Sequence, residues 1–392
     1  MNKRSIESLS LKGDTVLVRV DFNVPIKEGT VSDDTRIKEA LPTIKYLLEK
    51  NCKVILCSHL GRPKGTVQSK YSLEPVSKKL SQLLNQTVLF AKECVGPLAQ
   101  TAANKLVAKE VLLLENLRFH AEEEKNDSAF AKELGSLANY FVQDAFGAVH
   151  RAHASTSGVP RILKSVLGFL VQKEVESLEK IVKNPAQPFV TILGGAKVSD
   201  KIDVIQNLMH CAQEILIGGG MSYTFLKAKG FSIGNSLLEA DKINFAQSLD
   251  PSGSKIKLPL DHVTTQKIEA GSKTVTTPDQ NIQESWIGVD IGPKSIEQIE
   301  KTLSNAKTIF WNGPLGIFEI PEFSRGTLQC AKAVAKATQR GAYTVVGGGD
   351  SIAALNSCGM KNSISHVSTG GGASLEFIEG KSLPGIEAIE SV

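Results

Sequence analysis

A glycine turn followed by two lysines is the stretch of this sequence with the clearest chemistry. The apolar run Phe189–Leu193 is typical of a buried strand, and Gly194 and Gly195 follow it directly. Glycines there permit a tight turn and close approach of the backbone to a ligand. Lys197 and Lys201 then open a predicted helix, four residues apart and so on one helical face. Together these features predict an anion site, although an ordinary turn with two solvated lysines fits the same pattern.

Two further glycine-rich loops occur towards the end of the chain. Gly347–Ser351 follows the apolar run Tyr343–Val346 and precedes Ile352–Leu355, which predicts a second anion site at the start of a helix. Asp350 would repel a phosphate there unless a cation bridges the two, as Mg²⁺ does between carboxylate and phosphate oxygens. The alternative role for Asp350 is a helix cap. Thr369–Ser374 predicts a third loop of this kind, with a plain turn as the alternative.

The arginines are concentrated in the first half of the chain. Seven of the nine precede residue 165, and Arg is the side chain suited to capturing carboxylate and phosphate with two parallel hydrogen bonds. Polar residues also follow the predicted strands of this half, where parallel sheets bind ligands. They are Asp21, Asn23, His59, Arg62, Arg118 and Arg151. We therefore predict two anion sites, a compact anion held by arginines in the first half and a polyphosphate held by backbone amides in the second.

Other clusters of polar residues are less informative. His150 and His153 flank Arg151 and have no third metal ligand nearby, so a metal pair is disfavoured. His59 is a better ligand-binding candidate because it lies near an arginine at a strand end, with a structural role as the alternative. The acidic triplet Glu122–Glu124 is expected to be a solvated surface.

Composition bounds the class of protein. A chain of 392 residues suggests two or three domains, and 41% hydrophobic with 22% charged residues is ordinary for a globular enzyme. A net charge of +4 is too small to argue for nucleic acid or a membrane as the partner. The six cysteines show no metal-binding spacing and are expected to be reduced thiols. With no apolar run of signal-peptide or membrane-spanning type, we expect a cytoplasmic protein.

Strands alternate with helices along the whole chain, which predicts parallel sheets. The predicted strands are Thr15–Val20, Val54–Cys57, Val111–Leu114 and Tyr140–Val142, then Phe189–Leu193, Glu214–Ile217, Lys255–Leu258, Thr308–Trp311, Tyr343–Val346 and His366–Ser368. Helices are expected at Thr35–Lys50 and Ser128–Ala138. A third helix, Leu170–Lys183, has apolar residues at steps of three and four and is stopped by prolines. We place the domain boundary there.

The sequence disfavours two other classes of protein. A dinucleotide-dependent dehydrogenase would need a GxGxxG fingerprint, and the sequence has none; the GxxxxGK[ST] loop of P-loop enzymes is also missing. A nucleic-acid-binding protein that used the arginines would need exposed aromatic residues among them, and only 6% of residues are aromatic.

Nine motifs in the same order make the chain resemble the phosphoglycerate kinase family over nearly its whole length. They are VRVDFNVP (Val18–Pro25, with Asp34, Thr35 and Arg36 shortly after), SHLGRPKG (Ser58–Gly65), LLLENLRFH (Leu112–His120), DAFGAVHRAHAS (Asp144–Ser155), LGGAKVSDKI (Leu193–Ile202), GVDIGPK (Gly288–Lys294), WNGPLGIFE (Trp311–Glu319), GGGDS (Gly347–Ser351) and STGGGASLE (Ser368–Glu376). Ser351 stands where many members have threonine, which keeps the hydroxyl.

The resemblance implies an α/β fold with two Rossmann-like lobes, each a parallel sheet flanked by helices, and a cleft between them. Residues 1–170 would form a phosphoglycerate-binding lobe, 171–183 a linking helix and 184–381 a nucleotide-binding lobe, with the tail from about 382 to 392 returning to the first lobe. The implied activity is reversible transfer of the acyl phosphate of 1,3-bisphosphoglycerate to ADP, which gives 3-phosphoglycerate and ATP, by in-line transfer after domain closure. A cytoplasmic monomer without nucleic-acid or membrane partners is also implied.

The resemblance also implies roles for individual residues. Phosphoglycerate would be bound by Asp21, Asn23, Arg36, His59, Arg62, Arg118 and Arg151. The nucleotide, with its Mg²⁺, would be bound by Lys201, Gly288, Asn312, Glu319, Gly348, Gly349, Asp350 and Ser351, with Asp350 as the metal contact. Arg36, Lys197, Gly371 and Gly372 would surround the transferring phosphoryl group. No general base is needed, because the substrate carboxylate is itself the nucleophile and phosphoryl transfer relies on positioning and on nearby cations.

Overall fold

The computed structural model describes residues 2–250 and 253–392, and the chain divides into two compact units. The first contains residues up to Glu176 together with Ser382–Val392, and the second is Ser177–Lys381. The boundary falls inside one helix, α6 (Phe169–Val182), which begins in the first unit and ends in the second. Each unit has its own sheet and is described separately.

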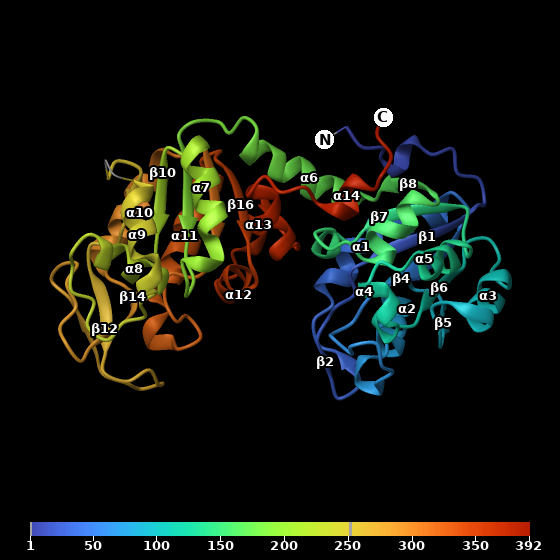
Figure 1. The fold of residues 1–392 in the computed structure, drawn as a ribbon, viewed down its shortest axis with the longest axis horizontal. Helices are drawn as coiled ribbons and strands as arrows, with labels where there is room; N and C mark the ends of the chain where they lie inside the picture. Colours follow the sequence, from blue (N-terminus) through green and yellow to red (C-terminus); the bar gives the residue numbers. More distant parts are fainter. Residues whose placement is uncertain (1, 251–252) are drawn as a thin grey trace. The chain divides into compact units, whose positions relative to one another are not determined.

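The first unit is built on a six-stranded parallel sheet with the order β5-β6-β4-β1-β7-β8 (Figure 1). Its strands are β1 (Thr15–Val20), β4 (Lys53–Cys57), β5 (Val88–Ala91), β6 (Val111–Leu114), β7 (Tyr140–Asp144) and β8 (Lys164–Leu167), and a hairpin adds β2 (Ile26–Lys27) and β3 (Thr30–Val31). Its helices are α1 (Thr35–Glu49), α2 (Glu74–Leu84), α3 (Gly96–Asn104), α4 (Ala121–Glu124), α5 (Ser128–Gly135) and α14 (Pro384–Glu387). All four predicted strands of this half are confirmed.

The core of the first unit explains why its central strands read as unbroken apolar runs. β4 and β6 are buried on both faces, as strands covered by helices on each side must be. Helix α1 places Ile37, Ile44 and Leu47 in this core, against the strands. Arg19 is the exception within β1, because it is charged and fully buried.

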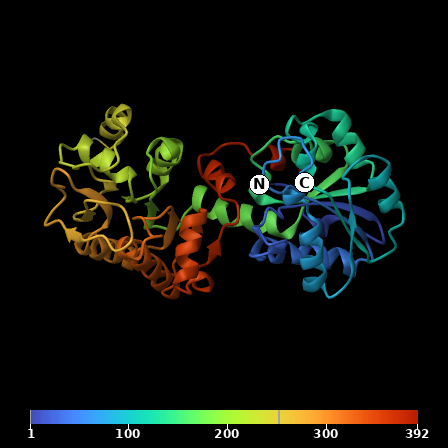
Figure 2. The same cartoon turned by 90° about the horizontal axis from the view of Figure 1, so that it is seen from below.

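The two ends of the chain lie side by side in the first unit (Figure 2). Lys3 and Ser391 form an antiparallel bridge, and the amide of Arg4 donates to the carbonyl of Glu390 at 3.1 Å. The amide of Gly385 donates to the carbonyl of Val149 at 2.8 Å, which joins α14 to the segment after β7. The last eleven residues are therefore part of the first unit.

The second unit contains a six-stranded parallel sheet with the order β11-β10-β9-β15-β16-β17. Its strands are β9 (Phe189–Leu193), β10 (Glu214–Ile217), β11 (Ile256–Lys257), β15 (Thr308–Asn312), β16 (Tyr343–Gly347) and β17 (His366–Val367). Its helices are α7 (Ile202–Cys211), α8 (Met221–Ala228), α9 (Ile243–Leu249), α10 (Pro293–Asn305), α11 (Arg325–Gln339), α12 (Gly349–Ser357) and α13 (Gly372–Ile378). The six predicted strands are confirmed, each to within a residue at either end.

A second, antiparallel sheet in this unit is absent from the sequence-based expectations. It has the order β13-β12-β14 and consists of β12 (His262–Thr265), β13 (Thr274–Thr276) and β14 (Ile287–Ile291). β13 is exposed along its length, so no apolar alternation marks it. The remaining short helical turns include η3 (Leu117–Phe119), the π-turn η5 (Ala154–Gly158) and η7 (Ser199–Lys201).

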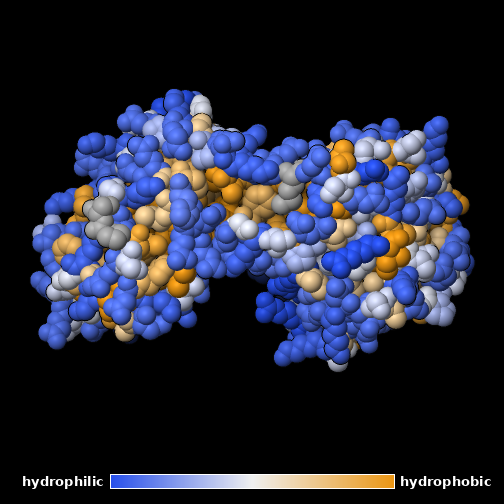
Figure 3. All heavy atoms as spheres, turned by 45° about the horizontal axis from the view of Figure 1, so that its top comes forward, coloured by the Kyte–Doolittle hydropathy of each residue, from blue (hydrophilic) through white to orange (hydrophobic). Residues whose placement is uncertain are grey.

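The surface fits a protein whose apolar residues are mainly in the two cores. Hydrophilic residues cover most of the face shown in Figure 3, and hydrophobic ones form smaller patches among them. Among the described residues, no helix has both the length and the apolar character needed to span a bilayer.

Candidate active site

Loops after four neighbouring strands line one edge of the second sheet. β10, β9, β15 and β16 are adjacent and parallel, so the residues that follow them gather at their carboxyl ends. The loops pack backbone to backbone: the amide of Gly194 donates to the carbonyl of Asn312 at 2.9 Å, and that of Gly195 to the carbonyl of Pro314 at 3.0 Å. A Cβ on Gly194 would lie 2.0 Å from the Pro314 oxygen. Only glycine permits this approach.

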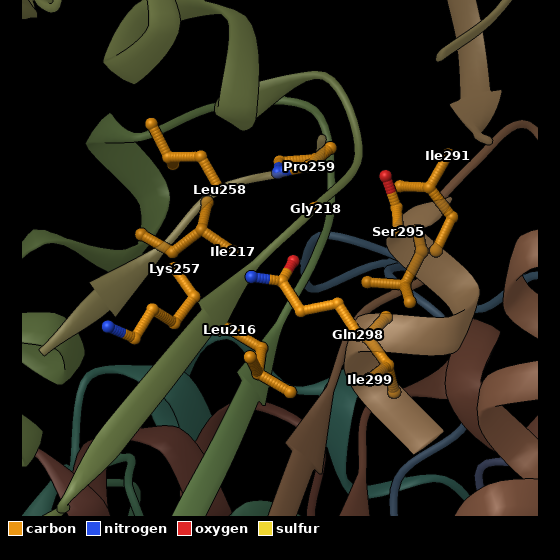
Figure 4. A pocket seen from close by; sticks show the side chains of 11 residues that line it. Leu216, Ile217, Gly218, Lys257, Leu258, Pro259, Ile291, Ser295, Gln298 and Ile299 are labelled. Atoms are coloured by element: carbon orange, nitrogen blue, oxygen red, sulfur yellow. The ribbon is translucent and has the colours of Figure 1, made fainter. Parts of the chain in front are cut away.

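A cavity of about 500 Å³ opens beside these loops, a size typical of sites for small-molecule ligands. Its walls are largely apolar, with Leu237, Ile287 and Val289 among the lining residues, while Glu319 and Asp350 contribute carboxylates. Gly288 also lines it, so three residues predicted to bind nucleotide share one cavity. A second hollow, between β10 and α10, holds only about 10 Å³, room for one water at most (Figure 4).

Lys201 and Asn312 form the polar centre of the glycine loops. Lys201 is 8% exposed, its ammonium donates to both the backbone oxygen (2.9 Å) and the side-chain oxygen of Asn312, and burial lowers its pKa to about 8. The Asn312 side-chain nitrogen is buried and has no hydrogen-bond partner among the described residues. A Cβ on Gly348 would lie 3.0 Å from that nitrogen. An unpartnered donor therefore faces the Gly348 backbone, where a phosphate oxygen could accept from it.

The placement of Lys197 corrects one expectation. Lys197 lies in the loop before η7, and α7 begins only at Ile202, so Lys197 and Lys201 do not share a helical face. The physical reason is Glu239, whose carboxylate accepts from the amides of Val198 and Ser199 and from the Ser199 hydroxyl. These amides are therefore satisfied within the protein. Lys197 is exposed and forms no ion pair with the described residues.

Asp350 is not a helix cap, so that alternative is wrong. The cap position of α12 is Gly348, with φ of 91°, and no side chain caps this helix. Asp350 lies in the first turn, exposed and on the wall of the cavity. The next residue, Ser351, is buried and accepts a hydrogen bond from the Gly313 amide at 2.7 Å. A free carboxylate beside an unpartnered amide donor fits a hard cation that bridges Asp350 to phosphate.

In the first unit, hydrogen bonds join four of the predicted residues directly or through Gly61, and His59 lies beside them; the four are Asp21, Asn23, Arg36 and Arg118. Asp21 accepts from Arg36 at 2.7 Å, and Arg19 contacts His59 at 3.1 Å, which lies 4.0 Å from Asp21. The second set meets at the backbone of Gly61. Asn23 accepts from its amide at 2.9 Å, and Arg118 donates to its carbonyl at 2.8 Å.

The histidines of the first unit report a concentration of positive charge. Burial lowers the pKa of His59 well below its usual value, and Arg19, Arg118, Arg151 and Arg36 lower it further. The pKa of His153 falls to about 3, again by burial first and then by arginines. Burial and neighbouring arginines also lower the pKa of His150, which accepts from Arg151 at 3.2 Å. These histidines are therefore neutral, and the positive charge around them comes from the arginines.

The remaining predicted residues have fewer contacts with the residues described above. Arg151 is half-buried, and its positive charge is among those that lower the pKa of His59. Arg62 is exposed, and no hydrogen bond to a described residue ties it to the others. The third glycine loop, Thr369–Ser374, leads from β17 into α13, with Gly371 at its cap position. Gly372, the first residue of α13, is exposed.

Two charged residues of the first site were missed by the sequence analysis. Arg19 is fully buried and donates to the Ser155 hydroxyl at 2.8 Å. Glu123 is also fully buried, although the triplet Glu122–Glu124 was expected to be solvated. Glu123 accepts from the Ser155 hydroxyl at 2.6 Å and amide at 2.9 Å. A charge within an apolar strand could have indicated Arg19, but no local signal distinguishes Glu123 from its neighbours.

The fold and these two clusters define an α/β enzyme with one candidate anion-binding site in each unit. Comparison with known proteins agrees. The family model of phosphoglycerate kinase matches residues 6–381. Phosphoglycerate kinase from Clostridium tetani is 52% identical over 395 residues, covering 99% of this chain and 98% of that protein. The Thermosipho africanus enzyme is 52% identical over 394 residues, with the same coverage.

Solved structures give the same result. The phosphoglycerate kinase of Coxiella burnetii superposes with a TM-score of 0.89 at 38% identity, and that of Pyrococcus horikoshii with 0.86 at 33%. Each comparison covers 98% of both chains. The chain belongs to the phosphoglycerate kinase family, glycolytic enzymes that transfer a phosphoryl group between 1,3-bisphosphoglycerate and ADP.

Proposed function

We propose that this enzyme divides its reaction between the units, phosphoglycerate binding to the first and Mg-nucleotide to the second. The reaction is reversible transfer of the acyl phosphate of 1,3-bisphosphoglycerate to ADP. One observation carries the division of labour: the first unit gathers arginines around the buried His59, and the second offers a largely apolar cavity beside glycine loops. A small, highly charged acid suits the former, and a nucleoside with its phosphates suits the latter.

In the first unit, the guanidinium groups of Arg62, Arg118 and Arg151 bind the phosphate and carboxylate of phosphoglycerate. Asp21 holds Arg36 in place through their 2.7 Å ion pair, so Arg36 is oriented before the substrate arrives. Asn23 accepts a hydrogen bond from the amide of Gly61, and Arg118 donates one to the carbonyl of the same residue. Asn23 therefore acts by positioning the backbone that holds Arg118. His59 is neutral and buried, and a neutral imidazole can donate one hydrogen bond to a substrate oxygen without adding charge.

In the second unit, the nucleoside occupies the 500 Å³ cavity. Gly288 lies beside the base and Glu319 accepts from the ribose hydroxyls. The phosphates lie along the backbone of Gly348 and Gly349, with Asn312, Ser351 and Lys201 next to them. Asp350 holds the Mg²⁺. Bound with the nucleotide, this cation neutralises charge on the phosphate oxygens.

Transfer requires the acyl oxygen and the phosphorus to approach within roughly 3–3.5 Å in line. Arg36 from the first unit, and Lys197 with the Gly371 and Gly372 amides from the second, surround the three equatorial oxygens of the transferring group. Lys197 is suited to this because it is exposed and has no competing ion pair among the described residues. The substrate carboxylate is the nucleophile in the ATP-consuming direction, so no protein side chain has to remove a proton.

We further propose that the units close on one another only when both ligands are bound, with α6 as the connecting hinge. An open site would let water intercept the phosphoryl group. Small-angle X-ray scattering of the free, singly liganded and doubly liganded enzyme tests this. The radius of gyration should fall only in the doubly liganded state, and four superimposable curves from active enzyme would rule closure out. The same samples should scatter as a monomer, which is the state proposed for this cytoplasmic enzyme.

Coupled ATP formation tests the function itself. Purified enzyme with ADP, Mg²⁺ and 1,3-bisphosphoglycerate should form ATP and 3-phosphoglycerate in equal amounts. Acetyl phosphate, an acyl phosphate that lacks the 2-hydroxyl and the 3-phosphate of the glycerate, should be a far poorer donor because it cannot engage the arginine cluster. Equal rates with both donors would contradict a phosphoglycerate site in the first unit.

A further inference from the structure

A group of three metal-binding side chains lies in the first unit, apart from the residues assigned to either substrate. Glu93, Cys94 and His120 each offer one ligand atom, and these atoms all lie within 4.8 Å of one another. Across residues 2–250 and 253–392, no other group of three or more His, Cys, Asp or Glu side chains meets this criterion. Glu93 and Cys94 follow β5, and His120 joins η3 to α4. The phosphoryl-transfer mechanism uses none of them.

Glu93 and His120 already bring an oxygen and a nitrogen ligand atom together. Nε2 of His120 lies 2.6 Å from Oε1 of Glu93, with a proton shared between them. A bound Zn²⁺ would take the place of that proton, with bonds of about 2.0–2.2 Å to oxygen and nitrogen. At tetrahedral angles this requires the two atoms to separate to roughly 3.4 Å. Their side chains are 35% and 28% exposed, so they are free to move by this amount.

Cys94 supplies a fixed third ligand. It is fully buried, and its amide donates to Oε1 of Glu93 at 2.9 Å, which ties the two neighbouring residues together. The ring of His120 packs against that of Phe130, with centroids 5.3 Å apart. The protein thus positions a thiol from the inside and presents the imidazole and carboxylate from the solvent side, which gives an ion a path of entry.

We infer that Glu93, Cys94 and His120 bind one Zn²⁺ ion, with water as the fourth ligand. The combination of sulfur, imidazole nitrogen and carboxylate oxygen is one that Zn²⁺ accepts at tetrahedral distances. Mg²⁺ prefers oxygen ligands in octahedral geometry and does not suit a thiolate. The ligand atoms therefore determine which metal binds in which unit: Mg²⁺ acts with the nucleotide in the second unit, and Zn²⁺ binds to the first unit.

The position of the site gives a bound ion a structural consequence. His120 follows η3, which carries Arg118, and the segment 121–124 immediately beyond it contains the buried Glu123. An ion that joins His120 to the loop after β5 cross-links two segments about 26 residues apart in the chain. Because the ligands are brought together only in the folded unit, Zn²⁺ should raise the thermal stability of the enzyme by mass action.

Titration of the ligand-free enzyme with Zn²⁺, in reducing buffer with excess Mg²⁺, tests the proposal. Calorimetry should show one Zn²⁺ bound per chain, and the melting temperature should rise with Zn²⁺ concentration. Co²⁺ in the same site should give a thiolate-to-metal charge-transfer band in the near ultraviolet, which a site without cysteine cannot produce.

Three variants locate the ion. His120→Gln and Cys94→Ser should each weaken Zn²⁺ binding by at least about tenfold, and Cys94→Ser should abolish the Co²⁺ band. His120→Gln changes a partly exposed side chain, so it remains informative if Cys94→Ser folds poorly. The matched control is the double variant His210→Gln with Cys211→Ser, which removes a neighbouring histidine and cysteine on α7. It should bind Zn²⁺ as the wild type does.

Two results with these variants would overturn the inference. One is Zn²⁺ binding that is unchanged in both His120→Gln and Cys94→Ser, which would show that these residues are not ligands. The other is loss of binding in the α7 control, which would place the ion at His210 and Cys211 instead. Absence of any Zn²⁺ binding or stabilisation in the wild type would also reject the site.

Discussion

The two proposed anion sites differ in how they would hold negative charge. The first unit buries charged side chains: Arg19, Arg118 and Glu123 are all nearly or fully buried. The second unit brings backbone close to the ligand, with glycine loops packed so tightly that a Cβ on Gly194 would collide with Pro314. Desolvation penalises the first arrangement, and loss of chain freedom penalises the second.

The difference has a chemical consequence. Guanidinium groups recognise a particular set of anionic oxygens and hold their orientation through side-chain partners, as Asp21 holds Arg36. Backbone amides and an apolar cavity recognise a shape, and they need a cation to neutralise a polyphosphate. Substitutions in the first unit should therefore act through charge and geometry, whereas those in the second should act through the metal and through the few side chains present.

The largest expected effect is at Lys197, an exposed cation near glycine loops in which the other lysine, Lys201, is already bonded to Asn312. Lys197→Ala should lower kcat by about a thousandfold, as loss of a charge that stabilises the transition state typically does. Nucleotide affinity should change far less. Steady-state kinetics and ADP titration measure both, with the exposed Lys332 on α11 changed to Ala as the control. Near-normal kcat with a large loss of affinity would show that Lys197 only binds.

A smaller effect is expected at Asp350. Asp350→Asn should raise the Mg²⁺ concentration needed for half-maximal rate by on the order of tenfold, since the amide is a poorer ligand for a hard cation. The phosphoglycerate KM should stay constant, because that site is in the other unit. Asp241→Asn, at a surface ion pair with Lys242, is the control. A Mg²⁺ titration that coincides with that of the wild type would remove Asp350 from the metal site.

Buried carboxyl groups predict a pH effect on stability that the two units share. Burial raises the pKa of Asp144 in the first unit and of Asp290 in the second from 3.8 to about 7. The folded state thus favours the protonated acid. This contribution to stability is complete below about pH 4, where the unfolded chain is protonated too, and is lost as the pH rises to about 7.

Asp144→Asn tests the prediction with a neutral side chain that keeps an oxygen for the Leu170 amide, which it accepts from at 2.9 Å. The variant should gain stability relative to the wild type as the pH is raised from about 4 to about 7, with little further change above that. Urea unfolding across this window measures it. Parallel stability curves for the two proteins would mean that Asp144 titrates normally.

The sequence was sufficient for the inner strands of the two main sheets because these strands are buried on both faces. Runs such as Val111–Leu114 and Phe189–Leu193 are buried throughout and apolar except for Thr191. The edge strands were harder. β8 (Lys164–Leu167) begins with an exposed lysine, and β13 has no buried residue. Their pairing depends on neighbours distant in the chain, so local pattern could not reveal them.

The sites were predictable where residue type follows from chemistry, and less so where contacts are long-range. Glycines and arginines at strand ends predict two anion sites, and the fold places these loops after neighbouring parallel strands of the two sheets. Glu239, by contrast, satisfies the amides of Val198 and Ser199 from 40 residues away, and this removed the helix start expected at Lys197. Glu123 is similar, because only the folded chain brings Ser155 to its carboxylate.

The central claim is that the units bind different ligands independently, and reciprocal titration tests it most directly. Arg118→Lys keeps the charge but loses the planar fork of donors. Asn312→Asp keeps the oxygen that accepts from Lys201 and replaces the unpartnered nitrogen with a second, anionic oxygen. Calorimetry would measure the binding of 3-phosphoglycerate and of MgADP to each variant and to the wild type.

Arg118→Lys should weaken 3-phosphoglycerate binding by about tenfold or more, the cost of one good charge-assisted hydrogen bond, and leave MgADP binding unchanged. Asn312→Asp should do the reverse, because a carboxylate there repels phosphate. One contrary result is a variant that lowers the affinity for both ligands equally, and another is a variant that lowers it only for the ligand assigned to the other unit. Either result would contradict the division of the two substrates between the units.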